Sequence, residues 1–191
     1  MIFELGFGYT QGIGDIDFSP TQSIDRQGGL GLDFSVQTPL YVQGDFRLMI
    51  GAQGFGSQAD NKTLINQAPF PSSPLGGKTR YWGGGVLVGA DYRFNDRFTL
   101  NGNFMFDAMN VDFSAVQGGV TVVTGDETVV AVRGGLGAYY DIGSGVSLGA
   151  GVSYTHTGDY DTTTNTGVIL KAGGIRDWAA TMRLRFELGW Q

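Results

Sequence analysis

The chain has 191 residues, of which 33 are glycine, 13 phenylalanine, 8 tyrosine and 3 tryptophan. Its formal net charge is −6 and only 16% of its residues are charged, which argues against a nucleic-acid partner because such a partner needs a basic face. The absence of cysteine excludes a disulfide framework and a thiolate metal site. No apolar run approaches the ~20 residues of a membrane-spanning helix, so a helical membrane protein is excluded, whereas a membrane barrel of strands is not. The length suits one domain over residues 1–191.

Eight strands are predicted, because apolar and polar residues alternate with period two and glycine interrupts nearly every window of helical spacing. In chain order they span residues 2–10, 28–42, 46–56, 80–94, 98–110, 129–142, 146–157 and 178–190. The alternation is strictest in the last strand, where Arg183, Arg185 and Glu187 separate large apolar side chains.

The connections between these strands alternate in length. Residues 43–45, 95–97 and 143–145 are short turns, and residues 11–27, 57–79, 111–128 and 158–177 are long connections. This order predicts an antiparallel up-and-down arrangement with tight turns at one end and four long loops at the other. An even number of strands places both chain termini at the tight-turn end.

The predicted strands carry their charges on one face. The opposite face is a continuous row of Leu, Val, Ile and Phe, whereas the charged face also carries most of the strand glycines. The charged residues assigned to this face are Glu4, Asp33, Arg47, Asp91, Arg93, Asp107, Arg133, Asp141, Arg183, Arg185 and Glu187. A soluble barrel of the lipocalin kind points such a face outward, and a membrane barrel points it into the lumen.

Three features favour the membrane arrangement. The charged face is rich in glycine, which weakens a strand but leaves room in a narrow lumen. Its cations are all arginine, as buried ion pairs prefer. Aromatic residues gather near the strand ends, as expected for two interfacial girdles: Tyr9, Tyr41, Trp82, Tyr92, Phe94, Tyr140, Tyr154 and Trp178. A lipid-facing arginine costs ~2–4 kcal/mol at mid-membrane, so the register should be strongly fixed.

One residue does not follow this parity. Asp112 lies on the lipid side if the strand over residues 98–110 is simply extended. We therefore expect Asp112 to lie above the bilayer or beyond a β-bulge.

In strand number, loop alternation, inverted faces and terminal strand, the whole chain resembles the small eight-stranded outer-membrane barrels of Gram-negative bacteria. These are the transmembrane domain of outer membrane protein A, outer membrane protein X and the opacity-type adhesins. The resemblance implies that Phe186, Leu188 and Trp190 form the signal read by the barrel assembly machinery. Members usually end on the aromatic residue, whereas Gln191 follows here, which leaves open a trimmed end or a lost C-terminal domain.

The resemblance also implies a localisation in the outer membrane of a Gram-negative bacterium and contacts with its lipid and lipopolysaccharide. Met1 leads straight into "IFELGFGY", so we expect a mature form whose signal peptide has been removed. We expect a monomer that binds no nucleic acid, with a possible extracellular ligand at the long loops.

Little in the sequence indicates catalysis. Some barrels of this kind are lipid-modifying enzymes with a His-x-Ser pair on a strand, but here His156 is followed by Thr157 and Gly158. We expect an interfacial histidine, no enzymatic activity and no cofactor. We expect no metal site either, and the pairs Asp15/Asp17 and Asp159/Asp161 are interpreted as solvated loop carboxylates.

Two functions remain open at this stage. In the first, the charges form an ion-pair network that plugs the lumen, and the protein has a structural or surface-interaction role through its outer loops. In the second, the lumen is a narrow pore that conducts ions or small solutes.

Overall fold

The computed structural model describes the backbone of residues 1–12, 15–19, 22–63 and 75–188 and the side chains of residues 1–12, 27–60 and 76–188. Every regular element in this part of the chain is a β-strand. The strands are β1 Ile2–Gly12, β2 Asp15–Ser19, β3 Gln22–Gln43, β4 Phe46–Thr63, β5 Leu75–Arg93, β6 Phe98–Gln117, β7 Val120–Gly143, β8 Val146–Thr157, β9 Tyr160–Thr164, β10 Ile169–Ala172 and β11 Arg176–Glu187. No helix in the described ranges is long and apolar enough to cross a membrane.

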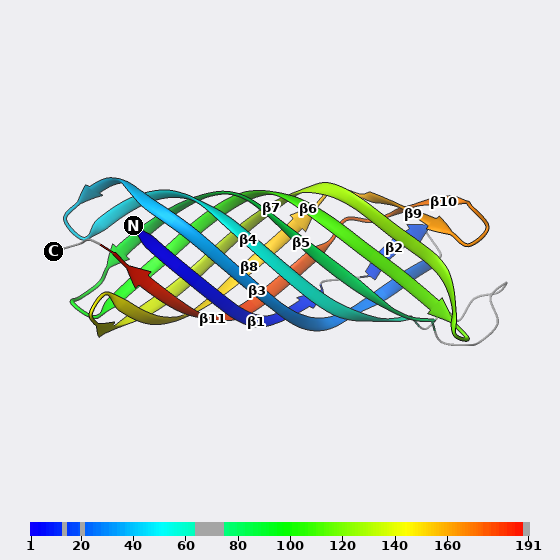
Figure 1. Ribbon diagram of the computed structural model, residues 1–191, viewed down its shortest axis with the longest axis horizontal. Coiled ribbons are helices and arrows are strands. Elements are labelled where there is room, and N and C mark those ends of the chain that lie inside the picture. The colour runs from blue at the N-terminus through cyan, green and yellow to red at the C-terminus, as the bar shows by residue number, and fades with distance from the viewer. Residues whose placement is uncertain (13–14, 20–21, 64–74, 189–191) are drawn as a thin grey trace.

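Eight of these strands form a closed antiparallel ring (Figure 1). The pairings run β1–β3–β4–β5–β6–β7, continue to β8 and β11, and return to β1. Such closure leaves no exposed sheet edge around the ring. The predicted fold class, an all-β eight-stranded up-and-down barrel, is therefore confirmed.

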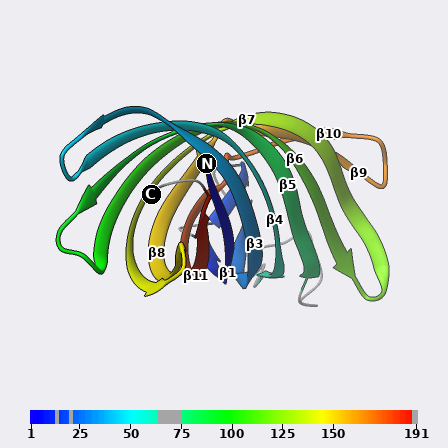
Figure 2. The same ribbon diagram turned by 60° about the vertical axis from the view of Figure 1, so that its left-hand side comes forward.

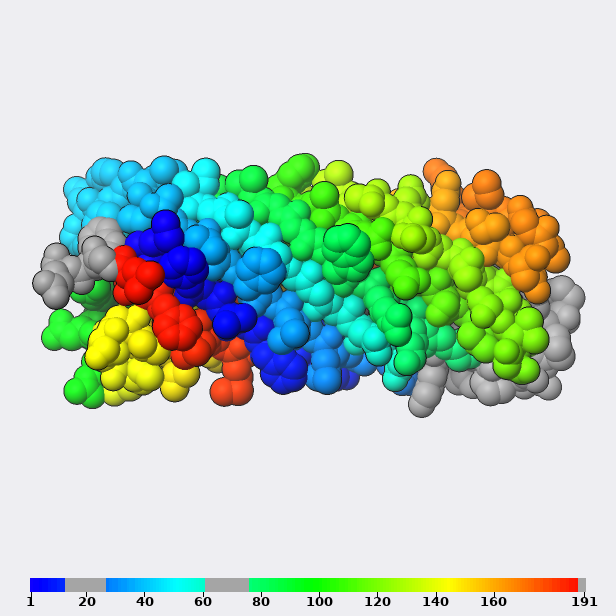
Figure 3. All heavy atoms as spheres, viewed as in Figure 1, coloured from blue at the N-terminus to red at the C-terminus, as the bar shows by residue number. Residues whose placement is uncertain are grey.

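The beginning of β1 and the end of β11 lie at the end of the barrel that carries the tight turns, which we call the turn end (Figures 1 and 3). The β3–β4 and β7–β8 turns place Gly44, Gly143, Ser144 and Gly145 at positive φ. In the β5–β6 turn, the Asn95 side chain accepts hydrogen bonds from the backbone N–H groups of Arg97 and Phe98, each at 2.9 Å. These local bonds fix short turns at the three predicted places.

The opposite end, which we call the outer end, contains more strand than the sequence predicts. The predicted connection 111–128 is almost entirely strand: β6 and β7 continue to a two-residue turn at Gly118 and Gly119, both at positive φ. The predicted connection 57–79 is strand up to Thr63 and again from Leu75. In Figure 2, the β6–β7 hairpin and the β9–β10 pair project at this end, away from both chain ends.

Candidate functional site

The outside of the barrel nearest the turn end is apolar. Its large side chains are 37–76% exposed. Together they form what we call the lipid-facing belt: Leu5, Phe7, Tyr9, Leu30, Leu32, Phe34, Val36, Phe46, Trp82, Val86, Val88, Tyr92, Phe98, Leu100, Phe104, Phe106, Val130, Leu136, Tyr140, Leu148, Val152, Trp178 and Met182. So large an exposed apolar surface is unstable in water and is the normal exterior of a membrane barrel. The predicted apolar row of each ring strand therefore faces outward.

The aromatic residues expected at interfaces lie toward the two ends of this belt. Tyr41, Tyr92, Phe94 and Tyr140 lie near the turn end, and Tyr9, Trp82, Tyr154 and Trp178 lie on the outer side. At the turn end, Tyr140 packs on Phe98 with ring centroids 5.1 Å apart, and its hydroxyl accepts a hydrogen bond from Arg97 at 2.8 Å. This bond raises the pKa of the exposed Arg97 guanidinium.

Arg185 is the centre of the charge network in the lumen. Its guanidinium lies 2.6 Å from a Glu4 carboxylate oxygen and 2.8 Å from one of Asp91, and it stacks 3.7 Å from the centre of the Tyr139 ring. Arg185 is fully buried, as is Asp91 to within 1%. One cation thus joins carboxylates from β1 and β5 across the barrel interior, with an aromatic ring from β7 covering its face.

Arg47 extends this network toward the turn end. It binds Asp91 at 2.8 Å and Glu187 at 2.7 Å, with a second bond to Glu187 at 3.0 Å. Arg47 and Asp91 are register partners on β4 and β5, so the sheet pairing itself places them side by side. The two bonds from Arg47 to Glu187 form a bidentate pair, which is the strong form of an arginine–carboxylate contact.

Arg183 lies one layer farther from the turn end. It approaches Glu4 at 3.7 Å and Asp33 at 3.9 Å, and its Nε donates to Thr181 at 3.1 Å. Gly6 is the register partner of both Arg183 and Asp33, and a Cβ at Gly6 would lie 2.4 Å from an Asp33 oxygen. Lumen glycine therefore makes room for charged side chains, as the sequence predicts.

Asp107 and Arg133 form a second cluster. They pair at 3.3 Å, Gln53 donates to both Asp107 carboxylate oxygens at 3.0 Å, and Arg133 stacks 3.7 Å from the centre of the Phe55 ring. The three residues come from β4, β6 and β7, so this cluster lies along one side of the barrel interior. We call Glu4, Asp33, Arg47, Asp91, Asp107, Arg133, Arg183, Arg185 and Glu187 together the lumen ion network.

Two residues assigned to this network from the sequence lie elsewhere. Arg93 is exposed in the last position of β5, and Asp141 is exposed near the end of β7, where it accepts a hydrogen bond from Gly143 N at 2.7 Å. Both have lumen parity, but parity does not show where the barrel interior ends. Asp141 instead supports the β7–β8 turn.

Sequence reasoning missed several buried lumen partners. Asp177 is 1% exposed and accepts a hydrogen bond from the Tyr81 hydroxyl at 2.8 Å, although it lies before the predicted last strand. Asn101 donates to Asp91 at 2.8 Å from the polar face of β6. Asparagine and glutamine residues at lumen-facing strand positions were the sequence feature that could have indicated such partners.

Beyond the ion network, toward the outer end, the lumen becomes apolar. The buried cluster there, which we call the outer core, contains Phe55, Tyr81, Met109, Val111, Phe113, Ala115, Val129, Ala131, Tyr160, Ala172 and Ile175. Tyr160, Ala172 and Ile175 come from β9, β10 and the segment before β11, so the β9–β10 hairpin packs into the barrel mouth. The outside of the same strands is polar, with Asn110 and Asp126 joined at 2.7 Å.

Asp112 belongs to this polar exterior. It is exposed on β6 and lies in unbroken register with Arg80 on β5 and Asp126 on β7. The nearest register shift on β6 occurs later, between Ala115 and Val116. Of the two expected explanations, a position above the bilayer therefore fits the structure, and a preceding bulge does not.

A cavity of about 30 Å³ lies in the lumen beside Asp33, Arg133, Thr155 and Asp177. That volume is about one water molecule's share of the liquid.

No family model matches the chain, and no curated protein matches it in sequence. Among solved structures, OprG of Pseudomonas aeruginosa is similar with a TM-score of 0.62 and 14% identity, covering 97% of this chain and 95% of that one. Neisserial surface protein A has a TM-score of 0.55 and 16% identity, covering 97% of each chain.

The chain has the fold of the small outer-membrane β-barrels. The outer-membrane protease OmpT of Escherichia coli is also similar, with a TM-score of 0.55 and 13% identity over 96% of this chain and 78% of that one. At these identities the likeness concerns the fold alone. The expected outer-membrane localisation is supported by this fold together with the lipid-facing belt.

The expected assembly signal lies at the end of the last barrel strand. Phe186 is half-buried on β11 and Leu188 is 59% exposed, whereas Trp190 lies outside the described residues. Backbone bonds between Met1 and Leu188, at 2.8 and 2.9 Å, join the two chain ends across β1 and β11. The role of these residues in assembly stays a prediction.

His156 lies on the outside of the barrel. It is exposed on β8, and the serines of that strand, Ser147 and Ser153, are buried on the opposite face. No group of three or more metal-binding side chains occurs among the residues described here. Asp159 accepts a hydrogen bond from Gly174 N at 3.1 Å, and the side chains of Asp15 and Asp17 lie outside the described residues.

Proposed function

We propose that this chain is an integral outer-membrane barrel with a closed lumen, whose role is structural or one of surface interaction at its outer end. The lumen ion network supports the proposal, because Arg185 and Arg47 join carboxylates from three strands through ion pairs inside the barrel. An eight-stranded barrel has an interior that side chains just fill.

The outer core supports the same conclusion independently. Its buried apolar side chains form a second layer beyond the ion network, so an ion that passed the charges would then meet apolar side chains. Moving an unpaired ion into such surroundings costs several kcal/mol after relaxation. Two successive layers of opposite chemistry close the barrel more securely than either alone.

The outer end offers the surface for interaction. Around a hollow of about 350 Å³ lie Asp112, Asp126, Glu127 and Asp161, contributed by β6, β7 and β9. These side chains extend above the belt into water, where loops and strand extensions of a barrel meet their ligands. We propose that extracellular ligands contact this end, while the barrel itself anchors the protein.

A narrow pore is the second candidate function. The small cavity beside Asp33, Arg133 and Asp177 favours it, because its lining is polar and it lies between the two layers. Under the closed-lumen proposal, conduction would require both the ion network and the outer core to move aside.

Single-channel conductance of the folded protein in a planar bilayer distinguishes the two functions. The closed barrel predicts silence for the natural protein and for Arg133→Ala/Arg183→Ala, because the outer core still blocks the lumen. A further variant with Phe113→Ser and Val111→Ser added should show openings. Steady openings of the natural protein, altered by Arg133→Ala/Arg183→Ala, would establish the pore and reject the closed barrel.

A further inference from the structure

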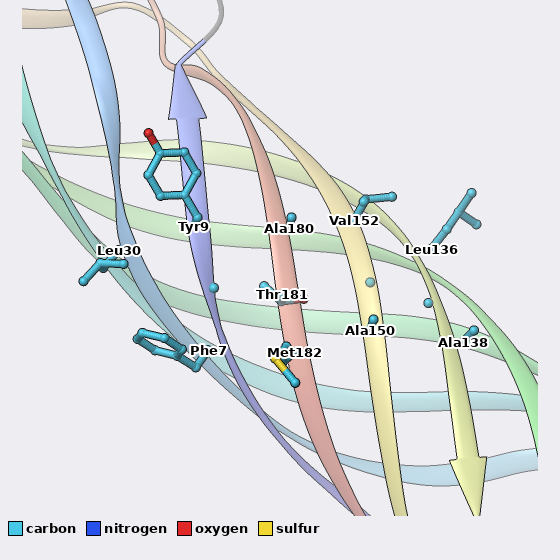
Figure 4. A pocket seen from close by; sticks show the side chains of 13 residues that line it. Phe7, Tyr9, Leu30, Leu136, Ala138, Ala150, Val152, Ala180, Thr181 and Met182 are labelled. Carbon is cyan, nitrogen blue, oxygen red and sulfur yellow. The ribbon is translucent and has the colours of Figure 1, made fainter.

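The lipid-facing belt contains a groove of about 690 Å³ that crosses β7, β8, β11 and β1 (Figure 4). Its floor is made of small side chains, including Ala138, Ala150 and Ala180, which face outward where neighbouring positions carry large residues. In Figure 4, Phe7, Tyr9 and Leu30 stand on one side and Leu136 and Val152 on the other.

A pair of aromatic rings follows the groove toward the outer end. Tyr154 and Trp178 are register partners on β8 and β11, with ring centroids 5.2 Å apart. Tyr154 lies two residues after Val152 on β8, and Trp178 lies two residues before Ala180 on β11. Both rings are therefore on the same outward face as the groove. Amphipathic rings at this position are typical of the boundary between acyl chains and headgroups.

Two basic side chains follow the aromatic pair. Arg176 and His156 are the next register partners on the outward face, and both are exposed. Directly opposed residues on neighbouring strands have Cβ atoms ~4.5–5.5 Å apart, so both side chains can reach one anion. Within the side chains that the structure describes, neither has an ion-pair or hydrogen-bond partner, and the β7 partner of His156 is the apolar Val132.

Arg80 provides a contrast on the other side of the barrel. It also follows an interfacial aromatic residue, Trp82, toward the outer end. However, its Nε donates to Gln58 at 2.9 Å, and its register partner on β6 is Asp112. Arg80 thus has polar and acidic neighbours within the protein, whereas Arg176 is available to bind an anion of another molecule.

We propose that β8 and β11 bind a phosphorylated, multiply acylated glycolipid of the outer leaflet, the lipid part of lipopolysaccharide. One acyl chain lies in the groove over Ala150 and Ala180, and a phosphate contacts Arg176 and His156. Arginine suits phosphate because its planar fork donates two parallel hydrogen bonds. The site rests on the membrane placement proposed above and is independent of whether the lumen conducts.

Retention of bisphosphorylated lipid A tests this site. The folded protein is mixed with lipid A in detergent, and native mass spectrometry counts the bound molecules. We expect the natural protein to retain one lipid. The affinity should fall about tenfold, corresponding to about 1.4 kcal/mol, when the phosphates of the lipid are removed and also in Arg176→Ser/His156→Ser. Ala150→Leu/Ala180→Leu, which fills the groove, should weaken retention similarly.

Two controls match these variants. Arg80→Ser removes an outer-end arginine elsewhere, and Ala52→Leu enlarges an exposed alanine of β4, so both should retain lipid A as the natural protein does. Far-UV circular dichroism confirms that each variant is folded. Equal loss in Arg176→Ser/His156→Ser and Arg80→Ser would overturn the site, and equally tight binding of phosphatidylglycerol would overturn its assignment to the glycolipid. Neither result would change the conductance expected of a closed lumen.

Discussion

The part of the barrel within the lipid-facing belt and the part beyond it have opposite construction. Within the belt, Phe104 and Phe106 of β6 point outward and Asp107 points into an ion network. A few residues along the same strand, Asp112 points outward and Phe113 is buried. The strand continues in register throughout, so what changes is the surrounding solvent. Lipid requires an apolar exterior and water requires an apolar interior.

This difference teaches that alternation alone does not identify the core of a long barrel strand. Period-two alternation continues through both regions, but the face that carries the large apolar residues changes sides. The ion network is held by pairing and burial, whereas the outer core is held by the ordinary hydrophobic effect.

Removing the central cation should have the largest effect. Arg185→Ala leaves Glu4 with only the more distant Arg183, and Asp91 with Arg47 as its remaining cation. Breaking a buried pair in this way typically costs ~3–5 kcal/mol. Urea unfolding in lipid vesicles measures the loss. The exposed Arg97→Ala is the control, with an expected change much smaller than that of Arg185→Ala. Similar losses in the two variants would mean that the network does not stabilise the barrel.

Placing arginine on the outer face of β6 tests the boundary between the two regions. Phe104→Arg puts a charge into the belt and should cost ~2–4 kcal/mol, whereas Asp112→Arg on the same face should be nearly neutral. Both are measured by the same unfolding experiment. If Asp112→Arg were as costly as Phe104→Arg, lipid would reach Asp112 and the proposed boundary would be wrong.

The lumen glycines should show an intermediate effect. A Cβ at Gly149 would lie 2.5 Å from the Tyr139 ring that covers Arg185, so Gly149→Ala should cost ~1–3 kcal/mol through overpacking. Gly134 has no atom within 4 Å of an added Cβ, and Gly134→Ala serves as the matched control. Equal stability of the two variants would show that the lumen is less tightly filled than described.

The turn between β6 and β7 should show the smallest effect on the free energy of unfolding. Gly118 has a φ of 58°, where a side chain is strained, so Gly118→Ala should cost about 1 kcal/mol. The tip lies beyond the belt, and the loss should therefore be confined to the outer part of β6 and β7. Hydrogen exchange of their amides checks this, and faster exchange at β6 residues within the belt would contradict it.

Much of the barrel was predictable from sequence because lipid imposes a strict rule. Every lipid-facing position must avoid charge, so Arg183, Arg185 and Glu187 fixed the parity of the last strand, and the structure places Arg185 in the lumen. The three tight turns were predictable from short Gly, Asn and Asp sequences. The specific partner of each charge was not, because pairing across the lumen depends on barrel stagger rather than on any one strand.

The outer extensions were not predicted, for a related reason. Outward residues such as Asn110 and Asp112 are polar, so the lipid-facing signal stops at Phe106 although β6 continues to Gln117. The buried row Met109, Val111 and Phe113 has the opposite parity and belongs to a core in water. The pair Gly118–Gly119 was a turn signal within a segment that was expected to be a loop.

A spin-label scan along the outer face of β6 would test the change of construction most directly. The chain has no cysteine, so single cysteines can be placed at the outward positions from Leu100 to Ser114 without background labelling. Accessibility to oxygen should dominate at Leu100, Phe104 and Phe106, and accessibility to a water-soluble nickel chelate should dominate at Asn110 and Asp112. A single type of accessibility along the whole series would contradict the account.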